Sequence, residues 1–248
     1  MYVLPQMELS DYETPVSASV ERSYTTESEI DQQLLALAAH FSTVGESELT
    51  GNQVRTMPAI DDEWVATVYP VPGINTVEDL RAQLRNRLDT YKESDFENRK
   101  VNAAVAALSQ RLEGEAPQEI VDIIAKDMIA DVEEEVLAEQ GKVLDTVLKE
   151  QKIKREDFDR AMYDRARDSV REGLTMDAVF RHEGMEVTDG DIEDAIRRIS
   201  ANAGDEAAVL QAQTNLREMG RTPELVEVAR RLKAGQWIAD HAQITVEV

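Results

Sequence analysis

Apolar residues recur every three or four positions along most of this 248-residue chain, a pattern that predicts amphipathic helices. The clearest example begins at Arg155 and carries its stripe at Phe158, Met162, Ala166, Val170 and Leu174. Gly184 ends this helix, because glycine adopts the left-handed backbone of a helix end without strain. Thr188 and Asp191 then have the spacing of a capping box, which opens a further helix. We therefore predict a helical hairpin over 155–200.

The same reasoning predicts other helices at 26–41, 76–112, 117–139, 143–148, 205–219 and 223–242. The helix at 76–112 is the longest, and at 1.5 Å per residue it would form a rod of roughly 55 Å. Strict alternation occurs at 15–24 and 243–248, so strands are expected only near the ends of the chain. The predicted fold class is mainly α: an elongated multi-helix body with minor β structure near the termini.

The charge balance limits the classes of partner. The chain has 50 acidic and 27 basic side chains, a net charge of −23. Such a charge disfavours nucleic acid and anionic membranes as partners and favours attraction to basic or unfolded polypeptide. The alternative is that the charge only keeps an open helical protein soluble.

Targeting signals are not recognisable. Met1–Pro5 lacks a basic region, and Pro5 interrupts the segment before an apolar core develops, so no signal peptide is predicted. No stretch reaches the ~20 apolar residues of a membrane span. The chain contains no cysteine, which fits a reducing compartment and excludes disulfides. We expect a cytoplasmic protein.

Catalytic and metal-binding patterns are not found. His40, His182 and His241 are scattered without a second ligand at helical spacing, so structural roles are favoured over metal binding. The acidic groups at 61–63 and 189–191 lie where helices begin, and capping explains them more simply than acid–base chemistry. Neither a phosphate-binding loop nor a nucleophile with its base is apparent. The prediction is no enzyme, no cofactor and no metal.

The apolar stripes suggest a binding surface. Long helices joined by short turns carry more apolar surface than pairwise packing readily covers, and flexible methionines suit surfaces that accept many partners. For each residue taken alone, core packing remains the favoured alternative. The candidate polypeptide-binding residues are Met128, Val132, Val136, Leu144, Leu148, Met162, Met176, Phe180, Met185, Leu216 and Met219.

Several ordered segments are similar to a known family. The chain resembles the chaperone (C-terminal) region of bacterial trigger factor in several segments that follow the same order. These segments are 4–12, 25–41, 60–64 with 76–81, 137–141, 158–189 and 237–246. The resemblance implies an extended lead-in with a strand at 1–24 and a helical chaperone-like domain at 25–248. It also implies two helical arms at about 117–183 and 184–236, which hold unfolded or nascent polypeptide in a cradle without ATP.

The chain also departs from the family pattern. A connector at 43–60 stands where the family carries its prolyl-isomerase domain, and the basic ribosome-docking signature has no counterpart. Lys154 replaces the small polar cap expected before Arg155, and Gly190 replaces an acidic residue. Ribosome docking and prolyl isomerisation are therefore not expected. An assembly or scaffold protein for one folded partner stays open as the alternative to a general chaperone, and isomerase activity is kept as a third hypothesis only because the family name suggests it. The sequence leaves open whether two copies bury their arms in each other as a homodimer.

Overall fold

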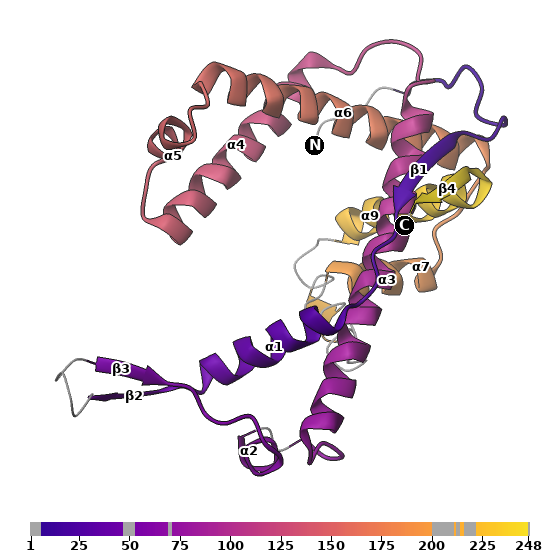
Figure 1. The fold of residues 1–248 in the computed structure, drawn as a ribbon. Coiled ribbons are helices and arrows are strands. Elements are labelled where there is room, and N and C mark those ends of the chain that lie inside the picture. Colours follow the sequence, from indigo (N-terminus) through magenta and orange to yellow (C-terminus); the bar gives the residue numbers. More distant parts are fainter. Residues whose placement is uncertain are drawn as a thin grey trace. The chain divides into compact units, whose positions relative to one another are not determined.

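The computed structural model describes residues 6–46, 53–68, 71–199, 211, 214–215 and 222–247. Its helices are α1 (Glu27–His40), α2 (Asp62–Val68), α3 (Val77–Ser109), α4 (Gln118–Gln140), α5 (Leu144–Glu150), α6 (Arg155–His182), α7 (Asp189–Ile199) and α9 (Thr222–His241). The strands are β1 (Ser17–Glu21), β2 (Thr43–Glu46), β3 (Gln53–Thr56) and β4 (Gln243–Glu247), and Figure 1 labels all these elements. The predicted fold class, mainly α with minor β structure near the termini, is confirmed.

The two terminal strands pair with each other. The N–H of Gln243 donates to the Val16 carbonyl and the N–H of Arg22 donates to the Glu247 carbonyl, each at 2.7 Å. Since the partners advance in the same direction along both strands, the pairing of β1 with β4 is parallel. Val16 and Val20 are buried and the residues between them are more exposed, as the alternation at 15–24 predicts.

A second strand pair lies inside the predicted polar connector. β2 and β3 form an antiparallel hairpin in which Thr43 is opposite Thr56 and Glu46 is opposite Gln53. The expectation that strands occur only near the ends of the chain is therefore wrong for this segment. The reason is that backbone hydrogen bonds can pair short strands without the apolar alternation on which the sequence prediction depends.

The chain divides into two compact units. One contains Met1–Ser19 and Lys100–Thr245, and is called the first unit here; the second unit contains Val20–Arg99 and Val246–Val248. Helix α3 begins in the second unit and ends in the first.

The second unit packs α1, α2 and the start of α3 around a small core. Its buried residues are Leu34, Ala38, Trp64, Val65, Ile74 and Leu80. The helix starts are capped as the sequence predicts: Thr26 and Glu29 form a capping box on α1, and the Asp61 carboxylate accepts from the Trp64 N–H at 2.8 Å. The acidic residue at 61 is therefore explained as a helix cap.

The main helix pairs of the first unit are α4 with α6, α6 with α9, and α7 with α9, and α5 packs on α4. The two helices and the turn predicted over 155–200 are present, and among the described residues α7 makes its main packing contacts with α9. The physical reason is that Ile196 of α7 finds its apolar partner in Leu225 of α9, and both are buried together. The turn itself is as predicted, with Gly184 at φ +58° and a Thr188–Asp191 capping box.

Close packing of α9 depends on a glycine. Gly235 lies where an added Cβ would stand 3.1 Å from Val101 Cγ1 and 3.4 Å from Met176 Sδ. A side chain here would press into the core of the first unit, which contains Val105, Leu108, Leu174 and Ile238. Gly235 thus fixes the distance between α9 and its neighbours.

Candidate functional site

Helices α4, α5 and α6 form an arm, defined here as residues 118–182, which can be followed in Figure 1. Helices α4 and α6 pack along each other. The short helix α5, which connects them in the chain, packs on α4. Gly141 adopts a left-handed backbone at the end of α4, which lets the chain turn directly into α5. The arm tip is defined as residues 133–156, where the three helices meet.

One arginine connects all three helices at the tip. Arg155, the first residue of α6, donates to Glu133 of α4 at 2.9 Å, to Asp145 of α5 at 3.0 Å and to Asp159 of α6 at 2.7 Å. These hydrogen bonds, that to Asp159 foremost, raise the pKa of Arg155 above its ordinary value. Charge-assisted bonds to three separate elements fix the position of α5 relative to α4 and α6.

The turn from α5 into α6 has a defined backbone geometry. Lys152 has φ +61°, and its N–H donates to the Lys149 carbonyl at 3.1 Å. The next N–H, that of Ile153, donates to the Leu148 carbonyl at 2.8 Å. This pair of bonds is a Schellman motif, which brings the side chains of Ile153 and Leu148 together.

Two hollows open at the arm tip, each with a buried leucine at its base. The first has a volume of about 320 Å³ and is lined by Leu137, Val143 and Leu144 together with charged groups. The second has a volume of about 560 Å³ and is lined by Leu148 and Ile153 with charged groups. Asp145 and Arg155 line both hollows, so their ion pair forms a wall common to the two.

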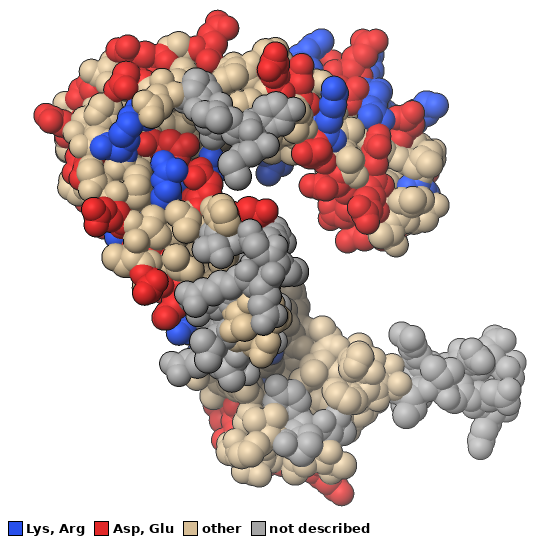
Figure 2. Space-filling model, turned by 180° about the vertical axis from the view of Figure 1, so that it is seen from behind, with Lys and Arg blue, Asp and Glu red and all other residues tan. Residues whose placement is uncertain are grey.

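The apolar residues around these hollows are exposed. Leu137 is 56% exposed, Val143 63% and Ile153 42%. Acidic side chains are numerous on the arm, as Figure 2 shows. Leu137 and Val143 line the first hollow and Ile153 lines the second, so each hollow has at least one exposed apolar side chain.

The structure places the predicted binding residues in several environments. Leu144 and Leu148 are buried and form the bases of the two hollows, whereas Val132, Val136 and Met162 are half-buried on the arm. Met128, Met176 and Met185 are half-buried and pack against the core of the first unit. The Arg230 guanidinium lies over the Phe180 ring, with its central carbon 4.9 Å from the centre of that ring. Leu216 and Met219 lie outside the described residues. Sequence reasoning did not identify Leu137, Val143 and Ile153 as binding residues: Val143 and Ile153 lie in the turns on either side of α5, and Leu137 lies in the last turns of α4.

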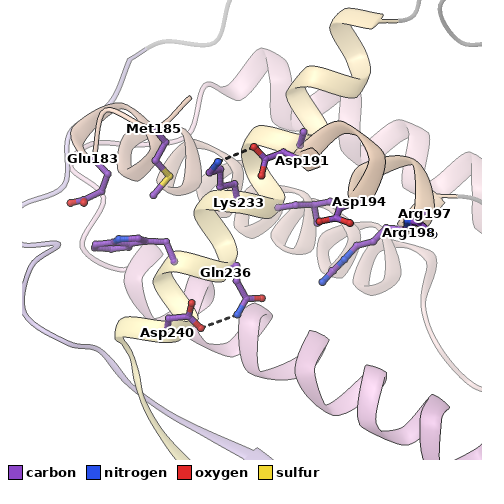
Figure 3. Close-up of a pocket in the computed structure, with 12 residues that line it drawn as sticks. Glu183, Met185, Asp191, Asp194, Arg197, Arg198, Lys233, Gln236 and Asp240 are labelled. Atoms are coloured by element: carbon purple, nitrogen blue, oxygen red, sulfur yellow. Dashed lines mark hydrogen bonds and ion pairs between the residues drawn. The ribbon is translucent and has the colours of Figure 1, made fainter. Parts of the chain in front are cut away.

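A second concave surface lies beside α9. This groove has a volume of about 710 Å³ and is lined by the turn that follows α6, by α7 and by α9. Its apolar lining is Met185, Ala229, Leu232 and Trp237. Figure 3 shows Lys233 of α9 directed at Asp191 of α7, and Gln236 directed at Asp240.

The polar groups of this groove hold its walls together. Lys233 Nζ lies 2.8 Å from the Asp191 carboxylate and 3.0 Å from the Glu186 carbonyl. The bond from Lys233, together with the Thr188 N–H, lowers the pKa of Asp191 to about 2. These groups link α7 to α9 across the groove.

The histidines have structural contacts. His182 Nε2 lies 2.8 Å from the Glu8 carboxylate and its ring stacks on Tyr12, while His241 stacks on Trp237. Among the described residues, no group of three or more potential ligands could hold a metal ion. Within the same ranges, no helix is both long and apolar enough to span a membrane.

Together these features define a helical scaffold that presents an apolar surface on an arm. The family profile described as "Bacterial trigger factor protein (TF) C-terminus" matches residues 76–240, which is more than half of the chain. The chain therefore belongs to this family, and the resemblance found in the sequence is confirmed.

Curated relatives agree with this assignment. The trigger factor of Anaeromyxobacter dehalogenans is 29% identical over 184 residues, which cover 74% of this chain and 41% of the relative. The trigger factor of Alkaliphilus metalliredigens is 24% identical over 168 residues, which cover 68% of this chain and 38% of the relative. The chain thus spans about two fifths of the length of these relatives.

A solved structure is also similar in part. It is described as "Promiscuous Substrate Recognition in Folding and Assembly Activities of the Trigger Factor Chaperone". The match has a TM-score of 0.43 at 16% identity and covers 80% of this chain and 49% of that one.

Proposed function

We propose that this protein is an ATP-independent holdase chaperone, which binds unfolded or nascent polypeptide in a cradle between its helical arms. Membership of the trigger factor family supports a chaperone role. The observation that carries the proposal is the exposed apolar patch of Leu137, Val143 and Ile153 on the arm tip. The arm supplies a rigid support for this patch, since Arg155 joins its three helices.

The proposed mechanism is weak apolar contact at several places on the chaperone. Burying one aliphatic side chain of a client contributes about 1.5–3 kcal/mol. Such contacts are non-directional, so many client sequences bind. Release follows from the fast dissociation of weak contacts and requires no nucleotide.

A denatured test protein that aggregates on dilution tests the proposal. We expect light scattering to fall as the chain is added in increasing amounts. The triple variant Leu137→Ser, Val143→Ser and Ile153→Ser should lose most of this effect. A matched control carries Leu35→Ser, Val71→Ser and Tyr91→Ser, which replace three exposed apolar residues of the second unit. Absence of suppression by the unmodified chain at several-fold molar excess would refute the holdase proposal.

Capture of cellular proteins distinguishes a general chaperone from an assembly protein for one partner. Mass spectrometry of proteins bound to the chain should identify many clients, each below stoichiometric amounts. A single stoichiometric folded partner would favour the assembly protein. Light scattering of the isolated chain tests the further proposal of a homodimer, for which we expect twice the mass of 27.8 kDa.

We further propose that the chain does not catalyse prolyl isomerisation. The described strands between α1 and α2 form the β2–β3 hairpin, and the connector at 43–60 is too short for a catalytic domain. Refolding of a protein that is limited by proline isomerisation should proceed at its uncatalysed rate. Acceleration in proportion to the amount of chain would contradict this proposal.

A further inference from the structure

The segment before β1 contains an extended strap, defined here as residues 6–14, which pairs with the turn after α3. The Ser10 N–H donates to the Arg111 carbonyl at 3.1 Å. The Glu113 N–H donates to the Glu8 carbonyl at 2.9 Å. These bonds accompany an antiparallel β-bridge in which Leu9 is buried. Backbone amides and carbonyls do not titrate, so this half of the docking is independent of pH.

The strap also binds the last turn of α6. Arg181 donates to the Met7 carbonyl at 2.7 Å and to the Glu8 carboxylate at 3.2 Å. The other carboxylate oxygen of Glu8 lies 2.8 Å from His182 Nε2. The His182 ring stacks on Tyr12, with the two ring centres 5.1 Å apart. The strap therefore connects the turn after α3 to the end of α6 within the first unit.

The two partners of the Glu8 carboxylate respond differently to pH. Arginine stays charged in proteins, so the contact with Arg181 keeps its charge. Histidine ordinarily gains its proton between about pH 8 and pH 5. Protonation of His182 therefore turns a hydrogen bond from a neutral ring into an ion pair with Glu8, which is the stronger interaction.

Other titratable groups lie around this contact. They are Tyr12 and Glu13 of the strap, Glu183 at the end of α6 and His241 of α9. Burial, with Glu183 and Glu13 nearby, raises the pKa of Tyr12 above its ordinary value, so Tyr12 stays neutral over the range in which histidine titrates. His241 Nδ1 lies 2.8 Å from the Trp237 carbonyl of its own helix. His182 is thus the histidine that bonds to the strap.

We propose that the strap is a pH-sensitive latch on the end of α6. It holds α6 more tightly when His182 is protonated and more loosely when His182 is neutral. Helix α6 also runs through the arm, so the latch sets how firmly the arm is anchored at its base. This inference concerns the regulation of α6 and does not depend on the proposed chaperone function.

Amide exchange of the full chain, measured by NMR at about pH 5.5 and about pH 8, tests the latch. The Ser10 and Glu113 N–H groups report the docked strap, because their bonds join the strap to the turn after α3. The Met185 N–H, which donates to the Phe180 carbonyl at 3.1 Å, reports the end of α6. Protection factors are compared, since they correct for the intrinsic dependence of exchange on pH. We expect all three to be about threefold higher at the lower pH, as suits a partly exposed ion pair.

Substitutions of the titrating pair and of a second histidine provide the controls. His182→Gln should remove the dependence on pH, because glutamine can bond to Glu8 but does not titrate. Glu8→Gln should remove it as well, since no carboxylate remains to pair with the charged ring. His241→Gln is the matched control, because His241 belongs to the same aromatic cluster and bonds within its own helix. This variant should retain the threefold change.

Four outcomes would overturn the inference. The first three are equal protection at both pH values in the unmodified chain, a pH change that survives in His182→Gln, and one that disappears in His241→Gln. The fourth is a change at Ser10 and Glu113 without one at Met185, because the strap would then respond to pH without holding α6. The aggregation test is independent of these measurements, so failure of the latch and failure of the proposed function are distinguishable.

Discussion

The N–H of Ile153 donates to the carbonyl of Leu148 at 2.8 Å. This bond links the exposed Ile153 to the buried Leu148, and both residues line the second hollow at the arm tip. It belongs to the Schellman motif that turns α5 into α6. Arg155 follows directly and ties the turn to α4 and α5. Backbone hydrogen bonds and ion pairs therefore help to position the apolar surface of the arm, together with the buried Leu144 and Leu148.

Lys152→Gly should stabilise the protein. Lys152 holds a left-handed backbone at φ +61°, which is unfavourable for a residue with a Cβ. Glycine removes this strain but gains entropy in the unfolded chain, so we expect a net gain of about 0.5 kcal/mol in the free energy of unfolding. Urea denaturation measures the change, and a loss of stability would contradict this account of the turn.

Gly184→Ala should destabilise the protein by about 1 kcal/mol. An added Cβ would have no atom within 4 Å, so the expected cost comes from φ +58° and not from a clash. Gly190→Ala is the matched control, since Gly190 lies within α7 and its added Cβ would make only an ordinary 3.7 Å contact with Thr188 Oγ1. That variant should gain about 0.5–1 kcal/mol from helix propensity. Equal effects of the two substitutions on stability would show that the left-handed backbone at Gly184 does not set the cost of adding a Cβ there.

Lys154→Ser should stabilise α6. Lys154 is the N-cap residue of this helix and makes no side-chain cap bond, as its departure from the family pattern predicts. A serine hydroxyl can accept from the free N–H groups of the first turn, a gain of about 0.5–1 kcal/mol. Thermal denaturation of the variant checks this expectation, and an unchanged midpoint would show that the first turn is satisfied otherwise.

Arg155→Met should loosen the arm tip. The substitution removes three ion pairs and leaves Glu133, Asp145 and Asp159 without their common cation. We expect a loss of about 1–2 kcal/mol and faster amide exchange in α5. Arg167→Met is the control, because Arg167 pairs with Asp164 within one turn of α6 and should contribute less than about 0.5 kcal/mol. Amide exchange in α5 that remains at its original rate would argue against the role of Arg155.

Asp191 should contribute stability that depends on pH. The bonds from Lys233 and Thr188 lower its pKa from 3.8 to about 2 in the folded protein. Since the folded pKa lies below the ordinary value, the contribution is complete above about pH 4 and is lost as the pH falls towards 2. Asp191→Asn should cost about 1 kcal/mol at pH 7 and little at pH 2. If the difference in stability between the variant and the unmodified protein stays constant from pH 7 to pH 2, the lowered pKa of Asp191 does not contribute to stability.

Much of the local structure can be predicted from the sequence. The capping boxes at Thr26 and Thr188 and the glycine ends at 141 and 184 lie where the sequence places them. These features depend on residues within one turn of each other, so spacing alone identifies them. The β2–β3 hairpin has no such local signal and was not predicted.

The candidate site was predicted only in part. Leu144 and Leu148 were identified as binding residues from their helical stripe, and they form the bases of the hollows. Val143 and Ile153 were not identified, although each is more exposed than either leucine. A stripe shows which face of a helix is apolar, but exposure depends on which neighbour covers that face.

The sequence by itself determined the helix ends that carry a capping box or a glycine, because these signals act over a few residues. The tertiary structure decided that α7 packs on α9 and that Arg155 joins three helices at the arm tip. It also decided that Leu137, Val143 and Ile153 remain exposed. These relationships join residues far apart in the chain, and they depend on which surfaces meet when the helices pack.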